Sequence, residues 1–196
     1  MGHTGTCRIR FVQGTAAMSA EHDQLTHEER VFVDLIEDIL RATPELRYHV
    51  HLTEAQNDDG DAPYAIFAIE TNPAHDLTVS IELAPNEFRL RVKGDAFAHS
   101  VQNRRRIDRW IDRRCRDVEQ LVSGDLKIEL ETLLGHSLSS GLYAGSKGNW
   151  KEIGERDDGW GWIGLLAWLL PFGLSPMRTH ETEYKDWFRV DQEPGD

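Results

Sequence analysis

The chain has 196 residues and a formal net charge of -12, with 34 acidic side chains against 22 lysines and arginines. This length fits one domain with extensions, and it suffices to bury a core without disulfides or metal ions. The negative charge disfavours general nucleic-acid binding, because contacts with phosphates need clustered positive side chains, so we expect no nucleic-acid partner.

The two cysteines, Cys7 and Cys115, lie far apart and belong to no paired motif, which indicates a reducing cytoplasmic location. Residues 1–24 lack hydrophobic periodicity and an apolar signal-peptide core, so we expect a disordered N-terminal segment. The sequence from Met18 onward is more typical of a natural protein start than the sequence from Met1. We therefore expect residues 1–17 to be an extension. The excess of arginine over lysine is typical of bacteria with GC-rich genomes.

A first helix is predicted over residues 26–43. Thr26 and Glu29 have the spacing of a capping box, in which each side chain accepts a hydrogen bond from a backbone N–H at the helix start. Pro44 ends the pattern, because the residue before a proline avoids helical angles. The expected apolar stripe consists of Phe32, Leu35, Ile36, Ile39 and Leu40.

Four strands joined by short turns are predicted next, over residues 46–53, 63–70, 77–83 and 87–93. Apolar and polar side chains alternate in three of them, and the second is more apolar throughout. The pattern indicates an antiparallel meander with one face on the core and one in water. The water-facing side chains include His49, His51, Arg89 and Arg91.

A second helix is predicted over residues 101–123, ended by Gly124. Arginines and aspartates alternate along it, and Asp112–Arg116 and Arg113–Asp117 have the i,i+4 spacing of exposed ion pairs. The favoured interpretation is a salt-bridged solvent face, and the alternative is a patch that docks an acidic partner or phosphate. A strand over residues 125–133 and a glycine-joined hairpin over residues 138–153 follow.

This order predicts a two-layer α+β domain, with an antiparallel sheet of about five to seven strands packed against two main helices. The domain would span residues 25–158, and residues 159–196 would form an apolar, Trp-rich C-terminal extension. The element order resembles that of small bacterial chaperone-like and immunity-type domains, as a likeness of order and not of motif.

Two sets of polar side chains are candidates for a site. His49 and His51 lie two apart on a strand, so both imidazoles point the same way, as the first two ligands of a zinc site do. His75, Asp76, His99 or His136 could supply a third ligand. With Arg89 and Arg91 the two histidines could also line a small-ligand or catalytic site. The favoured interpretation of the histidine pair is two polar residues on a solvated sheet face.

The segment 159–174 carries no charge, and its apolar side chains form the third candidate. It is shorter than a membrane-spanning helix and is interrupted by glycines and Pro171. It could be buried in its own domain or in a homodimer, bind a protein partner, or lie at a membrane surface. The candidate partner-binding residues are Trp160, Trp162, Trp168, Leu169 and Phe172.

No catalytic motif is complete in the sequence. The turn at residues 57–61 lacks the ligand spacing of a calcium loop, and the glycine-serine stretch at residues 135–141 lacks the second glycine of a nucleophile elbow. The sequence therefore favours a non-catalytic protein-interaction module, chaperone-, adaptor- or immunity-like, that binds a protein partner or itself without a cofactor. The alternatives are an enzyme or small-ligand binder that uses the polar sheet face, with zinc as its metal, and a peripheral membrane protein.

Overall fold

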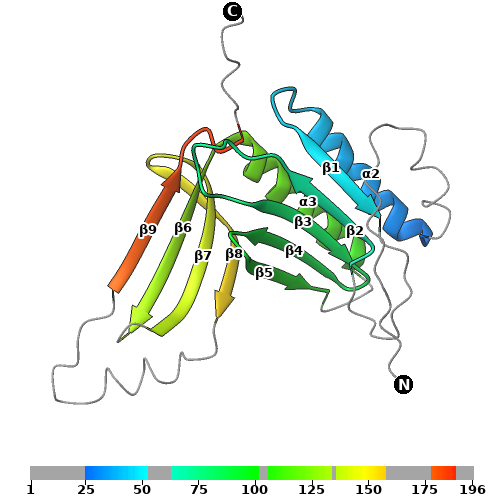
Figure 1. Cartoon of the computed structure of the whole chain (residues 1–196). Helices are drawn as coiled ribbons and strands as arrows, with labels where there is room; N and C mark the ends of the chain where they lie inside the picture. The colour runs from blue at the N-terminus through cyan, green and yellow to red at the C-terminus, as the bar shows by residue number, and fades with distance from the viewer. Residues whose placement is uncertain (1–24, 53–62, 102–105, 134–135, 158–177, 189–196) are drawn as a thin grey trace, which may run out of the picture.

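The computed structural model describes residues 25–52, 63–101, 106–133, 136–157 and 178–188. Within these ranges, two helices and nine strands form an α+β fold, as predicted (Figure 1). The strands form two antiparallel sheets, of five and of four strands, and the prediction of a single sheet was wrong. The described part holds no helix that is long and apolar enough to cross a membrane.

Helix α2 (His27–Arg41) begins at the predicted capping box. The N–H of Glu29 donates to Thr26 Oγ1 at 3.3 Å, and the N–H of Thr26 donates to Glu29 Oε2 at 2.8 Å. The buried arc runs from Phe32 through Ile36 and Leu40 to Val33. Leu35 was predicted in this stripe but is 39% exposed, because it lies about 60° outside that arc.

The first sheet, which we call the meander sheet, follows chain order. Its strands are β1 (Tyr48–Leu52), β2 (Ala65–Ile69), β3 (Val79–Ala84), β4 (Glu87–Val92) and β5 (Asp95–Ser100). The sequence did not reveal β5, whose small and polar side chains give little alternation. A two-residue turn at Lys93 and Gly94, both with positive φ, connects it to β4.

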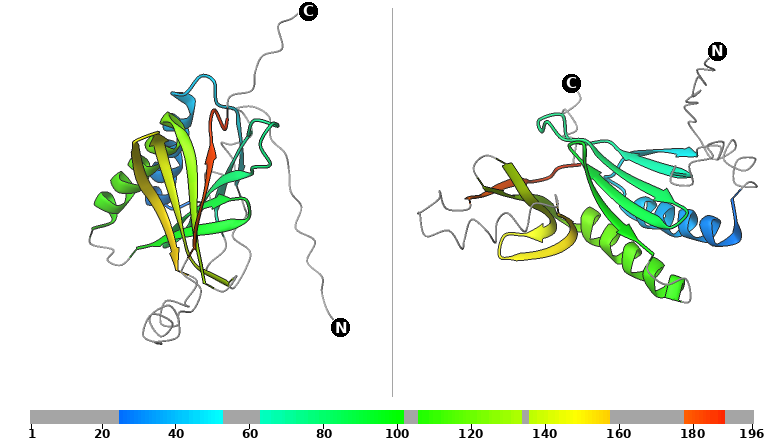
Figure 2. Two further views of the ribbon diagram at one scale, coloured as in Figure 1. Left: turned by 90° about the vertical axis from the view of Figure 1, so that its left-hand side faces the viewer. Right: turned by 90° about the horizontal axis from the view of Figure 1, so that it is seen from below.

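Helix α3 (Ile107–Ser123) packs beside α2, and both helices lie on the same side of the meander sheet (Figure 2). The Phe32 and Trp110 rings meet edge to face, with their centroids 5.6 Å apart, and so join the two helices. The helices cover the apolar face of the sheet, which the alternation of side chains predicted to lie on the core. The fully buried side chains of this core include Phe67, Ile81, Leu83, Phe88, Leu90 and Phe97.

The second sheet, which we call the C-terminal sheet, has the order β8-β7-β6-β9. Its strands are β6 (Asp125–Leu133), β7 (His136–Ser146), β8 (Asn149–Asp157) and β9 (Arg178–Tyr184), and β7 and β8 form the predicted glycine-joined hairpin. Strand β8 lies beside β5 of the other sheet. His99 Nε2 donates to the carbonyl of Ile153 at 3.2 Å, and Arg156 Nη1 donates to Asp95 Oδ1 at 2.5 Å.

Residues 184–188, which we call the C-terminal clasp, tie β9 to the rest of the molecule. Strand β9 ends at Tyr184, and Trp187 and Phe188 are buried in the turn that follows. The indole Nε1 of Trp187 donates to the carbonyl of Gly124 at 3.1 Å. The carbonyl of Trp187 accepts from the N–H of Asn72 at 2.7 Å, so the clasp joins both sheets.

Candidate functional site

The face of the meander sheet that points away from the helices gathers the predicted polar residues. The strand register places His49, Ala68, Ser80, Arg91 and Ala96 in one cross-strand row. The neighbouring row contains His51, Ile66, Glu82, Arg89 and Ala98. We call these ten residues the outward face, and they confirm that the two histidines and the two arginines share one side of the sheet.

The two arginines are held in place by carboxylates. Arg91 Nε donates to Oε1 of Glu82 at 2.5 Å, and Arg89 Nε donates to Oε2 of Glu87 at 2.6 Å. Arg89 Nη1 also lies 3.9 Å from Oε2 of Glu82, which is only 7% exposed. Charge-assisted hydrogen bonds of this kind fix the planes of the guanidinium groups. The arginines are therefore ordered while remaining at the surface.

The histidines do not converge with the arginines. Strands β2 and β3 stand between β1 and β4, so the two pairs are three strand spacings apart, about 14 Å. His49 Nε2 lies 2.9 Å from Oε1 of Glu70, the residue that directly follows β2. A pocket lined jointly by His49, His51, Arg89 and Arg91 is thus not formed by these strands.

No third zinc ligand stands beside the two histidines in the part of the chain that the structure describes. Among those residues, no three His, Cys, Asp or Glu side chains are grouped to hold a metal ion. Two of the candidate ligands make other contacts instead: His75 Nε2 donates to the carbonyl of Lys185 at 2.8 Å, and His99 donates to Ile153. Trp160, Trp162, Trp168, Leu169 and Phe172 lie outside the described residues.

The charges of α3 are arranged differently from the prediction. Asp117 pairs with Arg114, at 3.1 Å between Oδ2 and Nη2, and not with Arg113. Both partners are buried, at 6% and 4% exposure, because positions 114, 117 and 118 share the inward arc of the helix. Burial raises the pKa of Asp117, against the opposing effect of the Arg114 charge. This ion pair is therefore part of the packing between α3 and the sheets.

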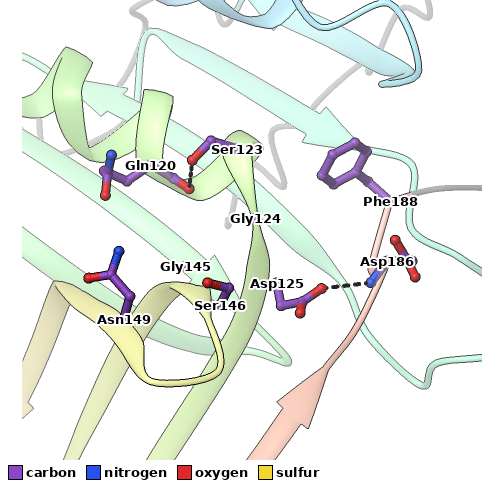
Figure 3. A pocket seen from close by; sticks show the side chains of 9 residues that line it. All are labelled: Gln120, Ser123, Gly124, Asp125, Gly145, Ser146, Asn149, Asp186 and Phe188. Carbon is purple, nitrogen blue, oxygen red and sulfur yellow. Dashed lines mark hydrogen bonds between the residues drawn. The ribbon is translucent and has the colours of Figure 1, made fainter.

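A polar cleft of about 410 Å³ opens where the end of α3, the start of β6, the β7–β8 turn and the C-terminal clasp meet (Figure 3). It is lined by Gln120, Ser123, Gly124, Asp125, Gly145, Ser146, Asn149, Asp186 and Phe188. The backbones of α3 and β7 approach closely beside it: a Cβ at Gly124 would stand 2.5 Å from the carbonyl oxygen of Gly145. No sequence pattern predicts this cleft, because its residues come from four separate segments of the chain.

The lining of the cleft favours hydrogen-bond donors and cations over anions. Asp125 and Asp186 both line it, and Oδ1 of Asp125 accepts from the N–H of Asp186 at 3.1 Å. Among the described residues that line the cleft there is no lysine, arginine or histidine, and the last turn of α3 carries no basic residue to offset its carbonyl groups. These groups can bind and orient a ligand, but they include no cysteine or histidine for nucleophilic catalysis.

Cys115 on α3 is the one thiol among the described residues. Burial raises its pKa to about 11, and the nearby Asp112 carboxylate adds to the effect. The thiol is therefore protonated at neutral pH and is a poor nucleophile, since the thiolate is the reactive form.

No protein-family model matches the chain, and comparisons with curated proteins and with solved structures give no significant match either.

Proposed function

We propose that the protein is a non-catalytic interaction module, chaperone-, adaptor- or immunity-like, that binds a protein partner or a second copy of itself through the outward face. The observation that carries the proposal is the composition of this face. Half-buried Ala96 on β5 lies directly beside the ordered Arg91, and half-buried Ile66 and Ala68 on β2 extend the face on the other side of β3. Both described helices pack on the opposite side of the sheet (Figure 2).

Small side chains make the outward face flat, so an approaching surface can come close to the sheet. Arginine is enriched in protein interfaces, where its guanidinium group stacks and forms paired hydrogen bonds. The side chain of Arg91 is 42% exposed, yet Glu82 already holds it in one position. Little further side-chain entropy is lost when such a residue enters an interface, which favours binding.

The ion pairs of this face favour recognition over catalysis. Glu82 is shared between Arg89 and Arg91, and Glu87 also pairs with Arg89, so these carboxylates are already neutralised. A general base would need its carboxylate directed at a substrate. The Trp-rich segment 159–174 is the second docking surface that the sequence suggests, and the same module could use it.

A site-specific photo-crosslinking experiment tests the proposal. A photoreactive amino acid replaces Ala68 or Ala98 on the outward face and, as the control, Asp34 on the exposed side of α2. The full chain is expressed in its native cells, irradiated, and its covalent adducts are identified by mass spectrometry. We expect one protein, or a second copy of the chain, to be linked from positions 68 and 98 and not from position 34.

The substitution Arg91→Glu is then added to the Ala98 probe variant, because it reverses the charge of an ordered arginine. We expect it to remove the adduct while circular dichroism shows the fold retained. Equal labelling from all three positions, or an adduct that survives Arg91→Glu, would overturn the outward face as the docking surface.

A further inference from the structure

Strand β9 forms one edge of the C-terminal sheet. It pairs only with β6 among the strands that the structure describes, and it is the outermost strand in Figure 1. All residues from Arg178 to Glu183 are exposed. An edge strand presents a row of backbone N–H and C=O groups that a further extended segment can pair with.

One side of this edge is acidic. The register of β9 with β6 places Glu181 opposite Glu129 and Glu183 opposite Lys127, and Thr179 lies opposite Glu131. Directly opposed side chains project from the same side of a sheet. Glu129, Glu131, Glu181 and Glu183 therefore form an acidic stripe along β6 and β9.

Lys127 is the cation on this side of β6, and its charge is already engaged. Its ammonium group pairs with the carboxylate of Glu129 and lies 4.7 Å from the centre of the Tyr143 ring. The same ammonium group lies 5.4 Å from the centre of the Trp150 ring, and the lysine side chain is only 9% exposed. At the open edge, Glu181 therefore lies opposite another glutamate, and Glu183 lies opposite a lysine whose charge is already engaged by Glu129 and by two aromatic rings.

A second copy of the chain does not fit this edge. When two copies of β9 pair edge to edge about a two-fold axis, equivalent side chains of the two copies project from the same side of the joined sheet. With Glu181 at the axis, Glu181 of one copy lies directly opposite Glu181 of the other. With Thr182 at the axis, Glu181 of each copy lies opposite Glu183 of the other. Like charges in opposed positions destabilise a strand pair. The register centred on His180 gives none of the glutamates a basic partner.

We propose that β9 binds an extended basic segment of a partner protein, which adds to the C-terminal sheet as a further antiparallel or parallel strand. Side chains two residues apart on a strand are separated by about 6.7 Å, so lysines or arginines at alternate positions fall opposite Glu181 and Glu183. Backbone pairing supplies the binding and the acidic stripe supplies the selectivity. This surface is separate from the outward face, so either proposal can fail without the other.

The probe is a terminally blocked, fluorescent peptide of alternating threonine and lysine, about eight residues long. Its binding to the full chain is measured by fluorescence anisotropy at low salt. We expect the double variant Glu181→Gln and Glu183→Gln to weaken binding at least about tenfold, since two opposed charge pairs are lost. The matched control, Glu28→Gln with Glu119→Gln, makes the same charge change on exposed helix positions and should bind within about twofold of the unchanged chain.

Backbone methylation separates strand addition from simple electrostatic adhesion. Two further peptides carry N-methyl groups on all lysines or on all threonines, and in a strand the N–H groups of alternate residues point to the same edge. We expect one of the two to lose at least about tenfold in affinity, because its bonding edge is blocked. Equal binding of all three peptides, or unchanged binding by the β9 double variant, would overturn the proposal.

Discussion

At the scale of single residues, His99 lies at the junction between the two sheets. It lies on β5, donates to Ile153 on β8, and its ring centre is 6.2 Å from that of Phe88. Burial lowers the pKa of His99 to about 4, and the positive charge of Arg114 adds to the effect. The native state thus holds this imidazole in its neutral form, whereas the unfolded chain protonates it near pH 6.5.

The stability of the protein should therefore depend on pH through His99. A depressed histidine pKa contributes stability that is complete above about pH 6.5 and is lost as the pH falls towards 4, because the unfolded state then binds the extra proton. We expect a loss of about 2 kcal/mol between pH 7 and pH 4.5, less than the full shift implies because the ring is partly exposed.

Urea unfolding of the unchanged chain and of His99→Gln at both pH values measures this contribution. Glutamine can still donate to Ile153 but does not titrate, so the carboxylates account for whatever pH dependence remains in the variant. Two pH profiles that run parallel would show that His99 is not the group responsible.

At the scale of elements, the C-terminal clasp attaches the end of β9 to the rest of the fold. Trp187 is fully buried and bonds to Gly124, and Phe188 packs against it with the ring centres 4.9 Å apart. We expect Trp187→Ala to destabilise the protein by about 3–5 kcal/mol, through the cavity it leaves and the lost hydrogen bond.

Chemical denaturation checks this value against Lys185→Ala, an exposed position in the same turn that should cost within about 0.5 kcal/mol. Trp187→Phe should fall between the two, since it keeps an aromatic ring but has no N–H for Gly124. Equal effects of Trp187→Ala and Lys185→Ala would contradict the role given to the clasp.

Single elements were the most predictable part of the fold, because their signals are local. The capping box of Thr26 and Glu29 formed as expected, and α3 ends before Gly124. Alternation also assigned His49, His51, Arg89 and Arg91 to one side of the meander sheet. Burial of Arg114 with Asp117 was not predictable from spacing, because i,i+3 and i,i+4 partners are equally close on a helix.

At the scale of the whole molecule, one hydrophobic core runs through both sheets. It joins Leu40 of α2 and Phe97 of β5 with Leu142 of β7 and Trp187 of the clasp. Alternation shows which side chains of a strand face inward, but not which strand lies beside it. The sequence therefore could not show that β6 starts a second sheet, or bring the four segments of the cleft together.

This continuity predicts that both sheets lose stability together. A Cβ at Gly154 would lie 2.8 Å from the Cβ of Phe97, where β8 meets β5. We expect Gly154→Ala to destabilise the protein by about 1–3 kcal/mol, because the seam must shift to admit the methyl group. Hydrogen exchange should show the same fall in protection free energy for β3 and β7. A fall confined to β7 and β8 would mean that the sheets unfold as separate units.

The clasp also has a consequence for synthesis on the ribosome. Trp187 follows every described helix and strand in the chain, yet it contacts Gly124 and Asn72, which emerge far earlier. The meander sheet and α3 can begin to pack while the clasp is still inside the exit tunnel, since folding proceeds from the N-terminal side during translation. The contacts of Trp187 over the α3–β6 junction are then among the last native contacts to form. A nascent chain arrested before residue 187 would leave that part of its core exposed to quality-control proteases.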